Sequence, residues 1–383
     1  RPGPVHLTFP QDLQTATVNP EGLPVLPQAP DTIPAATAPQ QISKIVNLLA
    51  KAQRPLLIAG SGLYYARGES ALAHFIQTFP IPVTVPIWDR GAISHSIETF
   101  MGVLGAATGG PRLLAESDLI LMVGARCDYR VGHLQPPGIS PDATIVRIDA
   151  DSTELHQGID THLMVHGNPA LVLGQLTKAI TDQGLVSPTV WVEKSIDLRD
   201  TFRDRCRSVK STAPNGRLHA LDVIQAIAEV LTEDTILVID GGNIGQWAHQ
   251  LLCDRYPGHW LTCGASGVVG YGIPAAMAAR ALDPDRPILL LSGDGALTFT
   301  VAEFETSARQ NLPFVALLAD DEAWGIALTG HEKKFDQGIT SELGPIEFAQ
   351  MAEGFGASGL RIGRAEDIVP AIQEGQCSDR PTL

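Results

Sequence analysis

The strongest constraint on the fold is a pattern that occurs twice, in which an apolar run ends in acidic residues. "PILLLSGDG" (287–295) leads six mostly aliphatic residues into Gly-Asp-Gly, and "FVALLADD" (314–321) follows the same plan. The sequence between them, "ALTFTVAEFETSARQ" (296–310), is typical of a helix. A strand, a crossover helix and a second strand predict a βαβ unit whose two parallel strands are neighbours in one sheet.

The two acidic loops are therefore expected to lie side by side. Asp294 and Asp321 are 27 positions apart, and their loops, 293–295 and 320–323, follow strands that lie about 4.8 Å apart. Two carboxylates beside a glycine turn suit Mg²⁺, which binds oxygen ligands at about 2.0–2.1 Å and shares them with phosphate. Glycine also lets the backbone approach a phosphate, and the helix that begins after Gly295 adds positive partial charge. The alternative is that each Asp only caps a turn, and the paired spacing favours the metal.

The same alternation of strands and helices extends along the chain. A first set of short buried strands, each ending in Gly or Asp, is expected at 54–62, 82–87, 118–128 and 143–151, after a helix at 40–52. A second set is expected at 235–243, 286–295 and 313–321. A proline-rich stretch (19–39) and a polar stretch (183–214) predict linkers. The pattern predicts an α/β protein of two tandem doubly wound parallel-sheet domains.

Composition narrows the possible partners. The 383 residues are 44% hydrophobic and 18% charged, which is typical of a globular protein. A net charge of -15 argues against nucleic acid, and no apolar run reaches the roughly 18–20 residues of a membrane span. The five cysteines are scattered without metal-ligand spacing, which favours reduced thiols and a cytoplasmic location.

Gly-Asp-Gly followed after 24 residues by an acidic pair resembles the diphosphate-binding motif of thiamine-diphosphate-dependent enzymes, and the whole chain resembles acetolactate synthases. The resemblance implies that Mg²⁺ is bound by Asp294, Asp321 and the backbone carbonyl of Ala323. Asp320-Asp321 replaces the commoner Asn-Asn pair of that family. Asp320 adds negative charge near a diphosphate, so the metal preference of this chain stays open.

Two further segments carry the resemblance to the cofactor site. "IDGGNIGQWAHQ" (239–250) corresponds to the segment that holds the far side of the diphosphate. In "TCGASGVVGYGIPAA" (262–276), the carbonyl of Gly267 would accept a hydrogen bond from the 4'-amino group of the cofactor, and Val269 would wedge it into its bent shape. The alternative for these glycines is a tight strand-to-helix turn. The implied cofactor-binding residues are Gly242, Asn243, Ile244, Gly267, Val269, Gly293, Asp294, Gly295, Ala296, Asp321 and Ala323.

The resemblance also implies a flavin site in the first sheet domain. "GARCDYRVG" (124–132) is similar to the segment that lies along FAD in acetolactate synthases, and "GSG" (60–62) and "IDADSTEL" (148–155) resemble their dinucleotide-facing loops. Arg126 would lie near the flavin nucleotide and Asp149 near the adenosine end, with glycines at Gly60, Gly62 and Gly124. The alternative is a domain that has kept the fold and lost the flavin.

The resemblance divides the chain into four parts. Residues 1–37 correspond to the tail of a pyrimidine-binding domain and a linker, 38–182 to a Rossmann-like middle domain, and 215–383 to the thiamine-diphosphate-binding domain, with 183–214 as a linker. The chain starts without Met, and both ends read as interrupted strands. We therefore expect a segment of a longer chain, whose activating Glu lies outside it, and expect residues 1–383 alone to be inactive.

The function implied by the resemblance is decarboxylation and carboligation of a 2-keto acid with thiamine diphosphate and Mg²⁺, in a homodimer or homotetramer. The run "DDEAWG" (320–325) is instead similar to benzaldehyde-lyase-type carboligases, so a 2-hydroxy-ketone lyase or a 2-keto acid decarboxylase is a second interpretation. A catalytically silent cofactor-binding paralogue is a third. Trp324 lines a substrate pocket or is a core aromatic. His249 and His331 are interpreted as ordinary surface or core residues.

Overall fold

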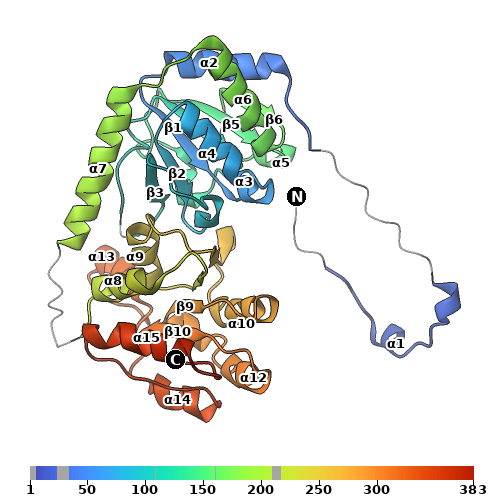
Figure 1. Cartoon of the computed structure of the whole chain (residues 1–383), viewed down its shortest axis with the longest axis vertical. Coiled ribbons are helices and arrows are strands. Elements are labelled where there is room, and N and C mark those ends of the chain that lie inside the picture. The colour runs from blue at the N-terminus through green and yellow to red at the C-terminus, as the bar shows by residue number, and fades with distance from the viewer. Residues whose placement is uncertain (1–5, 24–33, 108, 160, 209–216) are drawn as a thin grey trace.

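The structure is a computed structural model that describes residues 6–23, 34–107, 109–159, 161–208 and 217–383. Two parallel sheets form two units, which lie one above the other and are connected by the long helix α7 (Thr189–Arg207) (Figure 1). This confirms the predicted α/β fold with two parallel-sheet domains. No helix in the described part of the chain is long and apolar enough to cross a membrane.

The first unit contains a six-stranded parallel sheet in the order β3-β2-β1-β4-β5-β6. Its central strands are fully buried because helices cover both faces. On one face α6 packs against α2 and α4. On the other face Trp191 of α7 joins the apolar cluster under the sheet, and its indole N–H donates to the carbonyl of Pro55 at 2.9 Å.

The strands of this unit are β1 (Pro55–Ala59), β2 (Val83–Pro86), β3 (Phe100–Leu104), β4 (Leu119–Val123), β5 (Thr144–Asp149) and β6 (Leu163–His166). The helices are α2 (Pro39–Lys51), α3 (Ser61–Tyr65), α4 (Glu69–Thr78), α5 (Ser152–Leu155) and α6 (Pro169–Gln183), with 3₁₀ turns η2 (Arg90–Ala92) and η3 (Tyr129–Leu134).

The second unit is built on a four-stranded parallel sheet in the order β10-β9-β7-β8. Alternate residues of its strands enter two different apolar clusters. Leu237 and Ile239 of β7 pack with α8, α9 and α15, whereas Ile236 and Val238 pack with α10, α12 and α14. A strand with both faces buried carries a continuous apolar run, which is why β7, β9 and β10 were predictable.

The strands of this unit are β7 (Ile236–Ile239), β8 (His259–Thr262), β9 (Ile288–Gly293) and β10 (Val315–Ala319). The helices are α8 (Ala220–Val230), α9 (Asn243–Leu251), α10 (Gly272–Leu282), α11 (Asp294–Thr298), α12 (Glu303–Arg309), α13 (Gly325–Phe335), α14 (Phe348–Gly354) and α15 (Ile368–Gln376), with a 3₁₀ turn η5 (Gly264–Ser266).

Three expected segments differ from the prediction. Most of the expected linker at 183–214 is helix α7, which buries Trp191 and Phe202 on one side. The expected single crossover helix at 296–310 is two short helices, α11 and α12. The expected strand at the start of the chain is not formed within 6–14, where the only element is the one-turn helix α1 (Gln11–Gln14). Residues 1–5, and 24–33 of the proline-rich stretch, lie outside the described residues.

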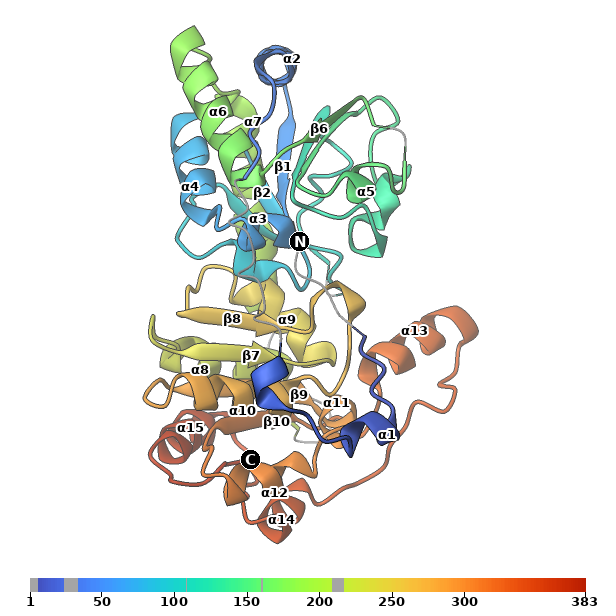
Figure 2. The ribbon, with the colours of Figure 1, turned by 90° about the vertical axis from the view of Figure 1, so that its right-hand side faces the viewer.

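The two units meet along α9 and the edge strand β8, which lies toward the six-stranded sheet (Figure 2). The side chain of Gln246 accepts a hydrogen bond from the backbone N–H of Ala107 at 2.9 Å, and the hydroxyl of Thr262 donates to the carbonyl of Trp88 at 2.6 Å. These side-chain contacts to backbone groups hold α9 and β8 against the loops that follow β2 and β3.

Candidate functional site

The carboxyl ends of β9 and β10 meet at Asp294. β9 ends at Gly293, opposite Ala319 of β10, and α11 begins at Asp294. The carboxylate of Asp294 is only 3% exposed, and its Oδ2 accepts a hydrogen bond of 3.0 Å from the backbone N–H of Ala323. Its Oδ1 accepts from the N–H of Gly295 at 2.7 Å. The expected convergence of the two acidic loops is confirmed.

The carboxylates of Asp294 and Asp321 both have a raised pKa. Desolvation raises the pKa of Asp294 to about 6, the hydrogen bonds from Gly295 and Ala323 oppose this, and the negative charges of Asp321 and Asp320 add to it. Burial also raises the pKa of Asp321. A divalent cation here would compensate both charges, so the donor set fits Mg²⁺. In the described ranges no three His, Cys, Asp or Glu side chains form a metal-binding group, and the expected set holds two carboxylates and a carbonyl.

Arg217 is a residue of this site that the sequence did not reveal. Its guanidinium forms an ion pair of 2.9 Å with Glu322 and donates to the carbonyl of Asp321 at 3.5 Å. Arg217 lies 104 positions before Asp321 in a polar stretch, so no local motif identifies it. It offsets part of the negative charge of the run 320–322.

The loop after β7 approaches the same place. Gly242 has φ +105° and lies against Gly293, where a Cβ would stand 3.1 Å from the Gly293 Cα. Asn243 and Asp321 converge at Gly325, because a Cβ there would lie 2.4 Å from Oδ2 of Asp321 and 2.6 Å from the amide nitrogen of Asn243. The structure thus brings together the predicted residues of three separate loops.

Asp240 fixes the glycine-rich turn beside this site. Its Oδ1 accepts hydrogen bonds from the N–H groups of Gly241 at 2.7 Å and Gly270 at 3.2 Å, and its Oδ2 accepts from Gly272 at 2.8 Å. Burial raises the pKa of Asp240, and these backbone hydrogen bonds oppose the rise. Asp240 directly follows an apolar strand, as Asp294 does, but it was not among the predicted site residues.

Val269, the predicted wedge residue, lies where two of these loops cross. A Cβ on Gly241 would stand 2.8 Å from Cγ1 of Val269 and 3.4 Å from the Cβ of Ala296. Gly267 is exposed and adopts φ +62°, a left-handed conformation that favours glycine. The turn therefore presents an accessible backbone at Gly267 and a packed, β-branched side chain at Val269.

Trp324 is half-buried at the edge of this site. A Cβ on Gly295 would stand 2.9 Å from its ring, and the ring of Phe299 meets it edge-on with 5.7 Å between centroids. The two histidines lie apart from this group. His331 is hydrogen-bonded to Ser341 at 3.1 Å, whereas His249 is completely buried.

His249 belongs to the core between the two units. Its ring meets Trp88 edge-on with 4.9 Å between centroids, and it packs tilted against Trp260 with 5.6 Å between centroids. Neither ring nitrogen has a hydrogen-bond partner among the residues that the structure describes. Burial, with the charge of Arg90 nearby, lowers the pKa of His249 to about 3. The residue is therefore a neutral core histidine.

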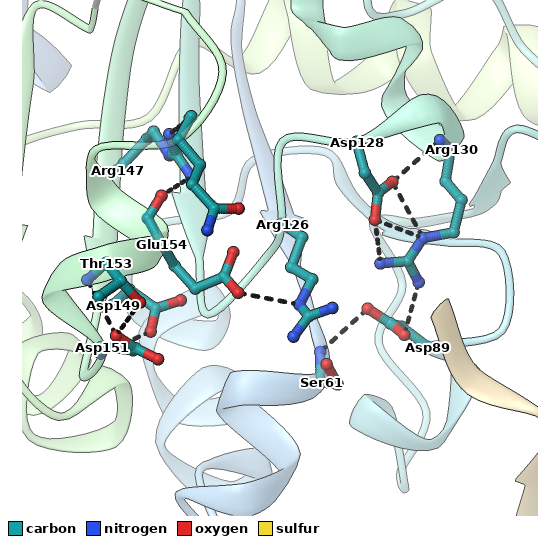
Figure 3. A network of polar contacts seen from close by, with 11 residues as sticks. Ser61, Asp89, Arg126, Asp128, Arg130, Arg147, Asp149, Asp151, Thr153 and Glu154 are labelled. Atoms are coloured by element: carbon teal, nitrogen blue, oxygen red, sulfur yellow. Dashed lines mark hydrogen bonds and ion pairs between the residues drawn. The ribbon is translucent and has the colours of Figure 1, made fainter. Parts of the chain in front are cut away.

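The residues predicted to face FAD lie at the carboxyl ends of β1, β4 and β5 (Figure 3). The side chain of Arg126 forms an ion pair of 3.2 Å with Glu154, and Asp149 accepts a hydrogen bond of 2.9 Å from the N–H of Asp151. Gly60 packs directly on the backbone of the loop that follows β4, because a Cβ on Gly60 would stand 2.4 Å from the Cα of Ala125.

Comparison with known proteins identifies the class that this fold and site define. Residues 42–176 match the central domain of thiamine pyrophosphate enzymes, and residues 240–383 match their C-terminal TPP binding domain. The chain therefore belongs to the thiamine pyrophosphate enzymes. The first match covers the six-stranded sheet, and the second begins at Asp240 and includes the acidic loops.

Among curated proteins, the chain is similar to large subunits of acetolactate synthase. It is 28% identical to isozyme 1 of Escherichia coli over 98% of this chain, and 27% identical to isozyme 2 of the same organism over 100% of this chain. It is 28% identical to the Corynebacterium glutamicum acetolactate synthase large subunit, also over 100% of this chain. The chain spans 65%, 68% and 62% of the length of these three relatives.

Proposed function

We propose that this chain binds thiamine diphosphate through Mg²⁺ and serves the decarboxylation and carboligation of 2-keto acids. Its relatives are named as large subunits of acetolactate synthase. The observation that supports this most is the junction of Asp294 with the loop 320–323. There the buried carboxylate of Asp294 and the exposed carboxylate of Asp321, both with a raised pKa, lie beside glycine-rich backbone at the end of a parallel sheet. Ligands of α/β sheets bind at this edge.

Each group of residues has a separate task in this proposal. Asp294, Asp321 and the carbonyl of Ala323 would hold the metal, and the N–H-bearing backbone around Gly242 and Gly295 would bind the diphosphate. The other residues that we propose to bind the cofactor are Asn243, Ile244, Gly267, Val269, Gly293 and Ala296. The bound cofactor would supply an electron sink for the carbanion formed when CO₂ leaves.

Among the described residues we assign none to acid–base catalysis. His249 is enclosed between two tryptophans, and His331 is bound to Ser341. We propose that the activating carboxylate comes from a pyrimidine-binding domain and that the complete site forms between subunits of a homodimer or homotetramer. The exposure of Gly267 and Val268 supports an additional contact on this side.

A silent cofactor-binding paralogue is the second candidate, and one observation favours it. The run 320–322 carries three acidic side chains where a diphosphate would bring further negative charge. Arg217 pairs with Glu322 and reaches the Asp321 carbonyl, so it compensates only part of that charge. The two candidates differ in turnover and agree in cofactor binding.

The test is a calorimetric titration with thiamine diphosphate in the presence of Mg²⁺ or of EDTA. We expect saturable binding with Mg²⁺ and none with EDTA. Equal affinity in both conditions would remove the metal assignment. CO₂ release from pyruvate by the protein as encoded in its natural gene then separates the candidates, because a silent paralogue binds the cofactor without releasing CO₂.

A further inference from the structure

The loops that would face a dinucleotide in the six-stranded unit already use their backbone donors within the protein. The N–H of Gly60 donates to the carbonyl of Val123 at 3.0 Å, and the N–H of Gly62 donates to the carbonyl of Gly124 at 2.8 Å. A Cβ on Gly62 would stand 2.8 Å from the Gly124 Cα. The glycines of this region therefore serve the close packing of one loop on another.

The remaining donor between those two glycines is bound by a carboxylate of the chain itself. The N–H of Ser61 donates to Oδ2 of Asp89 at 3.1 Å, and Oδ1 of the same Asp89 accepts from the guanidinium of Arg130 at 2.8 Å (Figure 3). A backbone N–H and an arginine are the two kinds of donor that bind phosphate oxygens. One carboxylate thus holds both.

This bridge is deeply buried. Asp89 is 5% exposed and Arg130 is 1% exposed. Arg130 also pairs with Asp128 through two nitrogens, with 2.9 Å between its Nη2 and Oδ2 of Asp128. Displacing Asp89 would leave a buried carboxylate without its cation, which is strongly unfavourable.

Arg126 and Arg147, which lie near these strand ends, also have partners within the protein. Arg126 pairs with Glu154, and the guanidinium of Arg147 donates to backbone carbonyls, among them that of Leu155 at 3.3 Å. An incoming pyrophosphate would meet arginines that already have partners, and it would also meet the negative charges of Glu154 and Asp89. Like charges at such distances repel.

We infer that Asp89 takes the place of a dinucleotide pyrophosphate between Ser61 and Arg130, and that this chain does not hold FAD. The six-stranded unit then keeps the dinucleotide-binding architecture with an internal carboxylate as its anion. This inference concerns a different unit from the thiamine diphosphate site, so its failure and the failure of the proposed function are distinguishable.

The experiment titrates the full chain with FAD and measures bound flavin by equilibrium dialysis and by quenching of flavin fluorescence. The variants are Asp89→Asn, which keeps the volume and removes the charge, and Asp89→Gly, which removes both. Asp182→Asn is the matched control, since Asp182 lies on the exposed end of α6 and pairs only with the exposed Lys178 among the described residues. Circular dichroism and thermal melting establish that each variant is folded.

We expect the wild type and Asp182→Asn to bind no FAD in the micromolar range. Asp89→Gly should bind at least about tenfold more FAD at the same free concentration. The substitution removes a negative charge that would repel the pyrophosphate, and it frees the N–H of Ser61 and the guanidinium of Arg130 to bind it. Asp89→Asn should lie between them. Saturable micromolar FAD binding by the wild type overturns the inference. So does a folded Asp89→Gly or Asp89→Asn variant that binds no more FAD than the wild type.

Discussion

The backbone N–H of Ala323 donates a 3.0 Å hydrogen bond to Oδ2 of Asp294. This contact spans 29 positions of sequence and joins the loops that follow β9 and β10. It orients a carboxylate that is otherwise buried without a cation among the described residues, and it sets the position of the proposed third metal ligand, the carbonyl of the same Ala323. Asp294 therefore has both a structural and a proposed metal-binding role.

Replacing Asp294 by Ala should abolish Mg²⁺-dependent binding of thiamine diphosphate, because one of two carboxylate ligands is lost. The fold should lose little stability. An unpaired N–H of Ala323 costs about 1–3 kcal/mol, but removing a buried carboxylate offsets much of that cost. Calorimetric titration and thermal unfolding measure the two effects. Asp321→Asn should be tolerated, since an amide oxygen also coordinates Mg²⁺.

The control for this change is Asp285→Ala, at an exposed position in the loop before β9, at the opposite edge of the sheet. It should leave cofactor affinity unchanged. Unaltered affinity in Asp294→Ala itself would sink the metal assignment.

Gly295 should not tolerate even a methyl group. A Cβ at this position would stand 2.9–3.0 Å from three ring atoms of Trp324, and such overpacking costs about 1–3 kcal/mol. We expect Gly295→Ala to lower the melting temperature and to weaken cofactor binding. The double variant Gly295→Ala, Trp324→Leu should recover much of the stability, because the obstructing ring is gone.

Gly330→Ala is the matched control, because a Cβ there meets nothing within 4 Å in helix α13. It should be neutral or slightly stabilising, as alanine favours helix more than glycine does. A Gly295→Ala variant as stable as Gly330→Ala would show that Trp324 moves freely.

The strands that sequence predicted are those buried on both faces. Ile236–Ile239 and Ile288–Gly293 are continuous apolar runs because helices cover both sides. The missed strands lie at sheet edges or carry mixed sequence. β8, "HWLT", buries only Trp260, and β6, "LMVH", buries only Val165. Edge strands such as β6 and β8 have too few buried positions to leave a pattern, whereas β3, "FMGVL", was missed although four of its five residues are buried.

The predictable part of the site is the part carried by spacing along the chain. Asp294 and Asp321 follow neighbouring strands, and their convergence follows from parallel topology alone. Arg217 and Asp89 act on residues far away in sequence, so only the fold reveals them. The 183–214 stretch was interpreted as a linker because α7 is mostly polar: only Trp191, Ser195, Phe202 and Cys206 are buried among its 19 residues.

Asp240 should position the turn that carries Gly267. Its two oxygens accept three backbone N–H groups, and in Asp240→Asn an amide NH₂ would face at least one of these donors. We expect a loss of about 1–3 kcal/mol in stability and weaker thiamine diphosphate binding. Titration calorimetry at a temperature where the variant is folded separates the loss of affinity from the loss of stability.

The control is Asp254→Asn, at a half-exposed carboxylate paired with Arg207. It should change neither stability nor thiamine diphosphate affinity by a comparable amount. Equal effects of both substitutions would contradict the positioning role of Asp240.

Acid should destabilise the protein through His249. Its pKa is lowered from 6.5 to about 3 by burial and by Arg90, so between these pH values the unfolded chain binds a proton that the folded chain does not. The stability that this residue contributes is therefore present above pH 6.5 and is lost as the pH falls toward 3. The loss is about 1.4 kcal/mol per pH unit in that window, or about 2 kcal/mol at pH 5.

His249→Phe keeps an aromatic ring between Trp88 and Trp260, so its melting temperature should fall less than that of the wild type between pH 7 and pH 5. The same substitution at His74, on the exposed side of α4, should leave the wild-type slope in place. Parallel pH profiles for the wild type and His249→Phe would show that His249 is protonated in the fold.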